Sequence, residues 1–328
     1  MTEPARTVFL GSGEFAIPIV ARLVDQPAID LLAVISAPPR PRGRGGQLSP
    51  APVGAWTLQR GVPLLTPARL RDSAAIADVL SLEPSLLVLA DYGQLVPPEL
   101  IELRHGALNV HPSLLPRHRG ASPIAAAILA GDELTGVTLM RMDAGLDSGP
   151  IVGQRALPLA GNETAPELER RLAQLGAELL VDSIEPWLAG TLQATAQPSE
   201  GATLSRQLRR ADGRLDPQLP AAQLARQVRA YLPWPGSFVD TPTGRLIVWQ
   251  ALPLLARGQG EAGTLVELGD TRRGGRLGLV TSDGVLELIE LQLAGGRRQS
   301  ATELLRGRPS LAGIRVVQAP GAGSESSG

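Results

Sequence analysis

The chain has 328 residues, of which 43% are hydrophobic, and a formal net charge of −1, a length and composition that favour a globular protein with two hydrophobic cores. All 31 basic residues are arginine and cysteine is absent, which excludes a Schiff-base lysine, the usual Walker A phosphate loop, thiolate catalysis, disulfides and cysteine-ligated metal centres. Only His105, His111 and His118 can carry acid–base chemistry through an imidazole, and because their spacing matches no helical metal-binding pair, no metal is expected.

The first half of the chain alternates short apolar runs with helix-like stretches. Residues 7–11 form an apolar run that ends in glycine, and residues 15–24 then repeat apolar residues at helical spacing. Further apolar runs lie at residues 31–36, 85–90 and 107–111, and a helix-like stretch lies between two of them at residues 73–82. Because such runs are typical of parallel strands covered by helices on both faces, this half is predicted to be a doubly wound α/β domain.

The turn after the first run has the sequence Gly-Ser-Gly-Glu-Phe-Ala at residues 11–16, which fits the dinucleotide-binding fingerprint. That fingerprint also requires an acidic residue at the end of the second strand. Here Asp30 precedes the run at 31–36, which ends in Ser36 and is followed by alanine and proline. The glycines are therefore interpreted as permitting a tight turn beside a ligand pocket.

Residues 37–52 are rich in proline, glycine and arginine. This composition is too irregular for a helix and too polar for a core. A mobile loop is therefore predicted, and by composition alone it could be an ordinary surface loop that carries arginines.

The first half of the chain is predicted to end near residue 190. Residues 136–142 and 151–157 alternate in polarity, and residues 163–188 predict a long amphipathic helix that closes a domain spanning 1–190. The polar segment 191–207 has the composition of an ordered linker.

The last part of the chain is predicted to be a small β-barrel or meander at 208–316, which begins with a helix at 221–230. Its short strands, punctuated by glycines, are predicted at residues 236–240, 245–250, 263–268, 276–281 and 285–293. Residues 317–328 offer no apolar side chains worth burying and are predicted to be disordered.

Charge is divided unevenly between the two halves. Residues 1–190 carry 15 arginines against 20 acidic residues, whereas residues 191–328 carry 16 arginines against 12 acidic residues. A basic second half suits contact with a polyanion, although a solvated charged surface would give the same counts. Because no apolar run reaches the length of a membrane span and the first residues lack a signal-peptide pattern, a cytoplasmic protein with no membrane partner is expected.

Asn109 and His111 stand two residues apart at the end of a predicted strand. Side chains alternate along a strand, so these two point to the same face and can meet one reacting atom. Open α/β sheets bind ligands at the carboxyl ends of their strands, where such a pair can donate hydrogen bonds to a developing oxyanion. Taken alone, such a pair would more often be structural.

Two motifs carry a resemblance to a known family. Residues 109–124, with the sequence Asn-Val-His-Pro-Ser-Leu-Leu-Pro-Arg-His-Arg-Gly-Ala-Ser-Pro-Ile, resemble the signature of the formyltransferases that use 10-formyltetrahydrofolate. Residues 136–149, which end in Asp-Ala-Gly-Leu-Asp-Ser-Gly, resemble the branch of that family that acts on methionyl-tRNA. Matching segments also occur at 9–16, 40–45, 197–201, 213–216, 231–235 and 282–286, so the resemblance extends to about residue 316.

The resemblance implies a Rossmann-like catalytic domain followed by an OB-like β-barrel that helps to bind tRNA. It implies an enzyme that transfers the formyl group of 10-formyltetrahydrofolate, the one-carbon donor, to the α-amine of methionyl-initiator tRNA for translation initiation. Folate and the charged tRNA are then the expected partners, and the protein is expected to be a monomer.

By motif position, the resemblance assigns the catalytic roles to Asn109, His111 and Asp147. The residues that it assigns to the folate site are Ser113, Leu114, Leu115 and Pro116. In the loop at 37–52 it assigns tRNA contacts to Arg42 and Arg44. In and beyond the linker, arginines can bind phosphate through two parallel hydrogen bonds, which makes candidates of Arg206, Arg209, Arg210 and Arg214.

Some positions depart from the family's pattern, and other functions remain open. Gly46 and Gln47 stand where the family often has lysines, and Asp91 stands where a small apolar residue is common. Asp91 is expected either on an exposed loop, which is favoured, or as a polar contact to the pteridine. The alternatives are a formyltransferase for a sugar nucleotide or glycinamide ribonucleotide, and a protein that binds tRNA or folate without catalysis.

Overall fold

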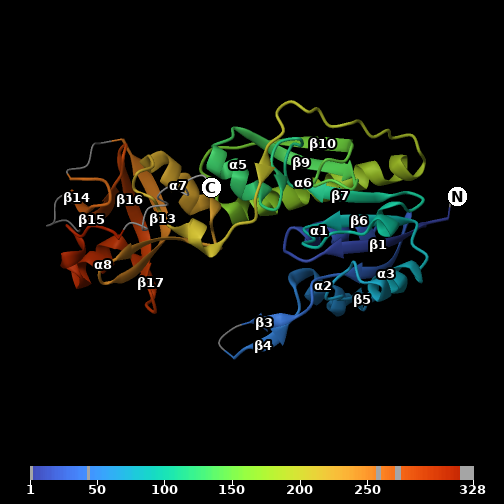
Figure 1. The fold of residues 1–328 in the computed structure, drawn as a ribbon, viewed down its shortest axis with the longest axis horizontal. Coiled ribbons are helices and arrows are strands. Elements are labelled where there is room, and N and C mark those ends of the chain that lie inside the picture. The colour runs from blue at the N-terminus through green and yellow to red at the C-terminus, as the bar shows by residue number, and fades with distance from the viewer. Residues whose placement is uncertain (1–2, 43–44, 256–259, 270–274, 318–328) are drawn as a thin grey trace, which may run out of the picture. The chain divides into compact units, whose positions relative to one another are not determined.

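A computed structural model describes residues 3–42, 45–255, 260–269 and 275–317 of the chain (Figure 1). The chain divides into two compact units. The first unit comprises Met1–Ala127, Asp132–Ala160 and Glu167–Gln207, and the second comprises Ile128–Gly131, Gly161–Pro166 and Leu208–Gly328. The segment predicted as a linker, 191–207, is thus grouped with the first unit.

Among the described residues, the first unit is built on a sheet of seven strands in the order β10-β9-β7-β6-β1-β2-β5. These strands are β1 (Ala5–Gly11), β2 (Ile29–Ile35), β5 (Leu64–Leu65), β6 (Leu86–Ala90), β7 (Ala107–His111), β9 (Leu134–Arg141) and β10 (Ile151–Pro158). From β7 to β5 all neighbours run parallel, whereas β9 is antiparallel to β7 and β10 is antiparallel to β9. The predicted α/β fold is confirmed, with a mixed sheet in which parallel strands dominate.

Helices cover both faces of this sheet. They are α1 (Ala16–Val24), α2 (Pro52–Arg60), α3 (Ser73–Leu80), α4 (Pro98–Ile101), α5 (Pro123–Ala130) and α6 (Ala165–Leu188). On one face, Val8 and Leu10 of β1 pack in a core with Val79 of α3 and Leu100 of α4. On α6, Gly176 allows close approach to β7, because a Cβ there would lie 2.8 Å from the side chain of Val110. Because side chains alternate along a strand, Asn109 and His111 lie on the face of the sheet opposite to Val110.

The segment 37–52 contains a short hairpin, which the prediction of a mobile loop did not include, and no helix begins before Pro52 in its described residues. Strand β3 (Arg40–Arg42) pairs antiparallel with β4 (Gln47–Ser49), as Figure 1 shows. The strands pair through backbone groups, which require no alternation of apolar and polar side chains. Because the segment is also rich in proline and glycine, its side-chain pattern does not predict strands.

In the described part of the second unit, six strands form an antiparallel sheet, which confirms the strand-rich domain predicted there. They are β12 (Ser237–Thr241), β13 (Gly244–Leu254), β14 (Leu265–Leu268), β15 (Arg276–Val280), β16 (Val285–Leu293) and β17 (Arg298–Ser300). The helices are α7 (Ala221–Ala230), α8 (Ala301–Gly307) and the short 3₁₀ turns η1 (Arg210–Gly213) and η3 (Pro309–Leu311). Sequence reasoning missed α8, whose start is capped by Ser300 and Glu303.

The predicted linker and the first residue of the predicted tail lie within the described residues. Val317 donates a backbone hydrogen bond of 2.7 Å to Asp240, and the rest of the tail predicted as disordered lies outside the described residues. In the predicted linker, β11 (Leu204–Ser205) pairs in parallel with β8 (Arg119–Gly120). Across the described residues, no helix has both the length and the apolar character that a membrane crossing requires.

Candidate active site

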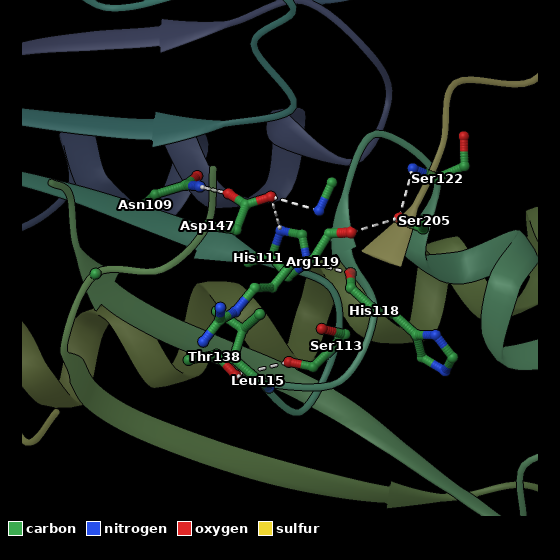
Figure 2. A network of polar contacts seen from close by, with 12 residues as sticks. Asn109, His111, Ser113, Leu115, His118, Arg119, Ser122, Thr138, Asp147 and Ser205 are labelled. Carbon is green, nitrogen blue, oxygen red and sulfur yellow. Dashed lines mark hydrogen bonds and ion pairs between the residues drawn. The ribbon is translucent and has the colours of Figure 1, made fainter. Parts of the chain in front are cut away.

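The structure brings Asn109, His111 and Asp147 together at the end of β7, as Figure 2 shows. The Asn109 amide donates to Oδ1 of Asp147 at 3.4 Å, and Nδ1 of His111 lies 3.6 Å from Oδ2 of the same carboxylate. The backbone N–H of Gly120 donates to that Oδ2 at 2.8 Å. One carboxylate therefore accepts hydrogen bonds from an amide and a peptide N–H and also faces Nδ1 of an imidazole, which donates only when it is protonated.

The loop that carries Asp147 is shaped by its own sequence. Asp143 accepts a hydrogen bond from the backbone of Gly145 at 2.9 Å and another from the hydroxyl of Ser148. Gly149 passes so close to β9 that a Cβ there would lie 1.9 Å from a backbone oxygen, so only glycine fits. Asp147 itself has φ +49°, a conformation that costs a non-glycine residue on the order of 1–3 kcal/mol and that the surrounding contacts must hold.

The imidazole of His111 is buried, with 5% of its surface exposed, and its two nitrogens have different partners. Nε2 lies 3.0 Å from the backbone oxygen of His118. Because a carbonyl oxygen only accepts, Nε2 carries a proton, and Nδ1 is left to face Asp147. Burial lowers the pKa of His111 below its ordinary value, against the opposing effects of the Asp147 carboxylate and the His118 carbonyl. The neutral imidazole can therefore accept a proton at Nδ1.

This lowered pKa predicts a pH dependence of stability. Below pH 6.5 the unfolded chain protonates His111 while the folded chain does not, so the free energy of unfolding falls as pH is lowered. The contribution amounts to at most about 1.4 kcal/mol per pH unit and is fully present above the unfolded pKa. Urea unfolding between about pH 8 and about pH 5 should show a smaller loss in His111→Gln than in the wild type. Equal losses in the two proteins would contradict the burial argument.

The four residues predicted to bind folate, 113–116, lie in the loop between β7 and β8. Ser113 and Leu115 are buried, and their polar groups bond within the protein: the Ser113 hydroxyl donates to the oxygen of Arg117 at 2.6 Å. The hydroxyl of Thr138 accepts from Leu115 N at 3.0 Å and donates to Ser113 O at 2.7 Å (Figure 2). Leu114 and Pro116 are half-buried. Ser113 and Leu115 thus hold the loop in shape, and contact with folate stays a prediction for all four.

His118 anchors the loop that holds His111. Its side chain is 6% exposed, and Nε2 lies 2.7 Å from Oδ2 of Asp132. The guanidinium of Arg117 binds the same carboxylate. Burial alone would raise the pKa of Asp132, but the hydrogen bonds from Arg117 and His118 bring it below its usual range. Sequence reasoning missed Asp132 because it stands apart from both motifs.

A cavity of about 440 Å³ opens beside the carboxyl ends of β1, β2 and β6. Its lining includes Ser12, whose hydroxyl accepts from the backbone of Ala37 at 3.1 Å and so joins the turns after β1 and β2. Three arginines also line it: Arg40, Arg69 and Arg71. Such a lining suits an anionic ligand. The last two arginines were missed because nothing in their local sequence marks them.

The turn read as a possible dinucleotide fingerprint borders this cavity. A Cβ at Gly13 would lie 1.8 Å from the carboxylate of Asp91, so glycine is needed for the close approach of that side chain. Asp91 itself is exposed and adopts φ +49°. The interpretation of the glycines as permitting a tight turn agrees with this contact.

The arginines predicted to contact tRNA fall into three groups. The side chain of Arg42 and the whole of Arg44 lie outside the described residues. Exposed side chains are found at Arg206, Arg209 and Arg210. Arg214 instead bonds to Asp240 at 2.5 Å. Within the described residues, no group of three or more acidic or histidine side chains could hold a metal ion.

Known proteins resemble this chain over nearly its whole length. Residues 5–184 match the family model described as formyl transferase, and residues 207–309 match the model of the formyl transferase C-terminal domain. The chain is 41% identical over 313 residues to a methionyl-tRNA formyltransferase of Halorhodospira halophila, covering 95% of this chain and 99% of the relative. It is 40% identical over 309 residues to that of Myxococcus xanthus, covering 94% and 96%.

Solved structures share the fold at lower identity. The sugar 3N-formyl transferase WlaRD has a TM-score of 0.62 at 14% identity, covering 88% of this chain and 98% of the other. HypX from Aquifex aeolicus, in complex with tetrahydrofolic acid, has a TM-score of 0.60 at 16% identity, covering 92% of this chain and 47% of the other.

Proposed function

The chain belongs to the formyl transferase family, and from this we propose that it transfers the formyl group of 10-formyltetrahydrofolate to the α-amine of methionyl-initiator tRNA. The observation that carries the proposal is the convergence of Asn109, His111 and Asp147 on one point. The relatives named as methionyl-tRNA formyltransferases support the choice of substrate, because they match almost end to end.

The three side chains divide the chemistry among them. When bound, 10-formyltetrahydrofolate supplies the electrophilic formyl carbon. One Nδ2 hydrogen of Asn109 points to Asp147, which leaves the second to donate to the formyl oxygen as negative charge develops there. His111 takes the proton of the attacking amine at Nδ1, the nitrogen left without a proton by the hydrogen bond at Nε2.

Asp147 then stabilises the charge that His111 acquires. Its Oδ2 lies 3.6 Å from Nδ1, so the imidazolium forms beside a carboxylate rather than in an apolar pocket. The protonated Nδ1 can donate to the oxyanion and afterwards return its proton to the departing nitrogen. The amine thereby gains the formyl group and loses one proton, and the folate nitrogen gains one.

Both proposed substrates are anionic, which fits the arginines on this chain. The folate carries glutamate carboxylates and the tRNA carries phosphates, while Arg40, Arg69 and Arg71 line the cavity at the sheet edge. We propose that the protein works in the cytoplasm and that it is a monomer. Analytical sedimentation at the assay concentration tests the oligomeric state.

Formylation of methionyl-tRNA by the purified protein is the direct test. With 10-formyltetrahydrofolate and methionyl-initiator tRNA, we expect formyl-methionyl-tRNA to accumulate, and a protein that binds either substrate without turnover would produce none. A small amine substrate would be indicated if a sugar nucleotide or glycinamide ribonucleotide were formylated and the charged tRNA were not.

Salt dependence supplies a separate prediction for the tRNA surface. Affinity for tRNA should fall steeply with salt, and Arg210→Ala should weaken binding and reduce the slope of log K against log salt by about 1. Arg104→Ala is the matched control, because Arg104 is also an exposed arginine but belongs to no predicted tRNA contact. Filter binding across a salt series measures both. An unchanged slope for Arg210→Ala would remove that arginine from the interface.

A further inference from the structure

Gln197 lies in the segment that precedes the second unit, and its side chain joins two loops of the candidate active site. Its amide Nε2 donates to the backbone oxygen of Asp147 at 2.9 Å and to that of Gly149 at 2.7 Å. Its Oε1 accepts from Nε of Arg119 at 3.0 Å and from Nη2 at 2.7 Å. One half-buried side chain thus bonds both to the loop that carries Asp147 and to the loop that follows His111.

The orientation of this amide follows from its partners. The two backbone oxygens can only accept hydrogen bonds, and the Arg119 guanidinium can only donate them. The NH₂ group of Gln197 must therefore face the carbonyls and its oxygen must face Arg119. Both amide hydrogens and both lone pairs of the oxygen are used, so a residue with only acceptors or only donors cannot replace it.

These contacts bear directly on the position of the carboxylate. Arg119 immediately precedes Gly120, whose N–H donates to Oδ2 of Asp147 at 2.8 Å. Gln197 consequently ties the backbone of Asp147 to the same short segment that binds its side chain. The backbone of Asp147, at φ +49°, needs such contacts to stay in a conformation that non-glycine residues rarely adopt.

The chain around Gln197 is itself held against this part of the first unit. Thr195 exchanges two backbone hydrogen bonds with Ile151 at the start of β10, at 2.7 and 2.8 Å. Farther on, the hydroxyl of Ser205 donates to the oxygen of Arg119 and accepts from the N–H of Ser122, each at 3.1 Å (Figure 2). The segment is therefore anchored on both sides of Gln197.

We propose that Gln197 is a positioning residue for formyl transfer, which holds Asp147 against His111 and Gly120 without touching the reacting atoms. The proposal rests on the proposed function. Gln197, a residue of the predicted linker, would then contribute to the rate of the chemical step.

Gln197→Glu tests this role because glutamate has nearly the same shape and only acceptors. The variant keeps a partner for Arg119 but loses both hydrogen bonds to the carbonyls of Asp147 and Gly149 and repels them instead. We expect kcat to fall by about tenfold to hundredfold, while KM for either substrate stays within about twofold. The matched control is Gln193→Glu, which makes the same change at an exposed position of the same segment and should leave kcat unchanged.

A second readout does not depend on activity. The chain contains three histidines, so their ring resonances can be assigned individually by NMR. In Gln197→Glu the His111 resonance should shift, because the carboxylate beside it has moved, while His105 should not.

The outcomes separate the two proposals. A wild type that formylates methionyl-tRNA, with a Gln197→Glu variant of equal kcat and an unmoved His111 resonance, would overturn the positioning role alone. A wild type without formyl transfer would overturn the proposed function, and the resonance shift would still decide whether Gln197 positions Asp147. A variant that lowers the melting temperature and raises KM with kcat unchanged would show a structural role only, against the proposal.

Discussion

Asp147→Asn is expected to lower kcat for formyl transfer by about a thousandfold or more. Asparagine has the shape of aspartate but replaces one acceptor oxygen with a donor NH₂. In this structure both carboxylate oxygens face donors, since Oδ1 accepts from Asn109 and Oδ2 accepts from the N–H of Gly120. Either placement of the new NH₂ group sets a donor against a donor, and the charge that stabilises protonated His111 is lost as well.

Asp143→Asn is the control for this variant. Asp143 lies in the same loop, but its carboxylate accepts from Gly145 and Ser148 within the loop and makes no contact with the three candidate residues. An asparagine oxygen can accept the Gly145 hydrogen bond in its place, so kcat should stay close to that of the wild type. Single-turnover rates of formyl transfer measure the chemical step for both variants. A similar small loss in both would mean that Asp147 acts only through the fold of the loop.

Asn109→Ala should lower kcat by about 10²–10³-fold, with little change in KM for either substrate. The amide has one hydrogen on Asp147 and one left for the formyl oxygen, so its removal takes away a donor that is needed most when negative charge has developed. A donor of this kind contributes about 2.7–4 kcal/mol of transition-state stabilisation.

The chain offers a matched control for this substitution, because its only other asparagine is Asn162, which is exposed. Asn162→Ala should leave kcat unchanged. The steady-state kinetics of both variants, with methionyl-tRNA and the folate varied in turn, separate kcat from KM. A rise in KM for the folate at constant kcat would instead show that Asn109 binds the substrate in its ground state.

Local pattern carried the prediction of the sheet, and its limits explain what was missed. Most of β1 and β2 and all of β6 are apolar because both faces of these strands are largely buried, so they stand out in the sequence. The hairpin of β3 and β4 is held by backbone pairing among arginine, proline and polar side chains, which leaves no such pattern. Helix α8 is short, and Ser300 and Glu303 suggest a helix start only where the following residues already predict a helix.

The candidate active site divides in the same way. Asn109 and His111 can be assigned to one face of a strand because they stand two positions apart, with a single residue between them, whatever the rest of the chain does. Nothing local shows that Asp147 meets them, and it was assigned by resemblance between motifs. Asp132, which anchors His118, stands 14 residues away from it in the chain, and without the structure it is one acidic residue among many.

Residues that stand near one another in the chain are enough to predict the class of fold, the periodic elements and the two motifs that bear the resemblance, and composition is enough to exclude lysine and cysteine chemistry. The folded chain was needed to show which nitrogen of His111 faces Asp147, that Asp132 binds His118, and that Gln197 bridges two loops. Gln197 stands 50 residues from Asp147 and 78 from Arg119. Hydrogen bonds between such distant side chains follow from the path of the folded backbone, which no local spacing records.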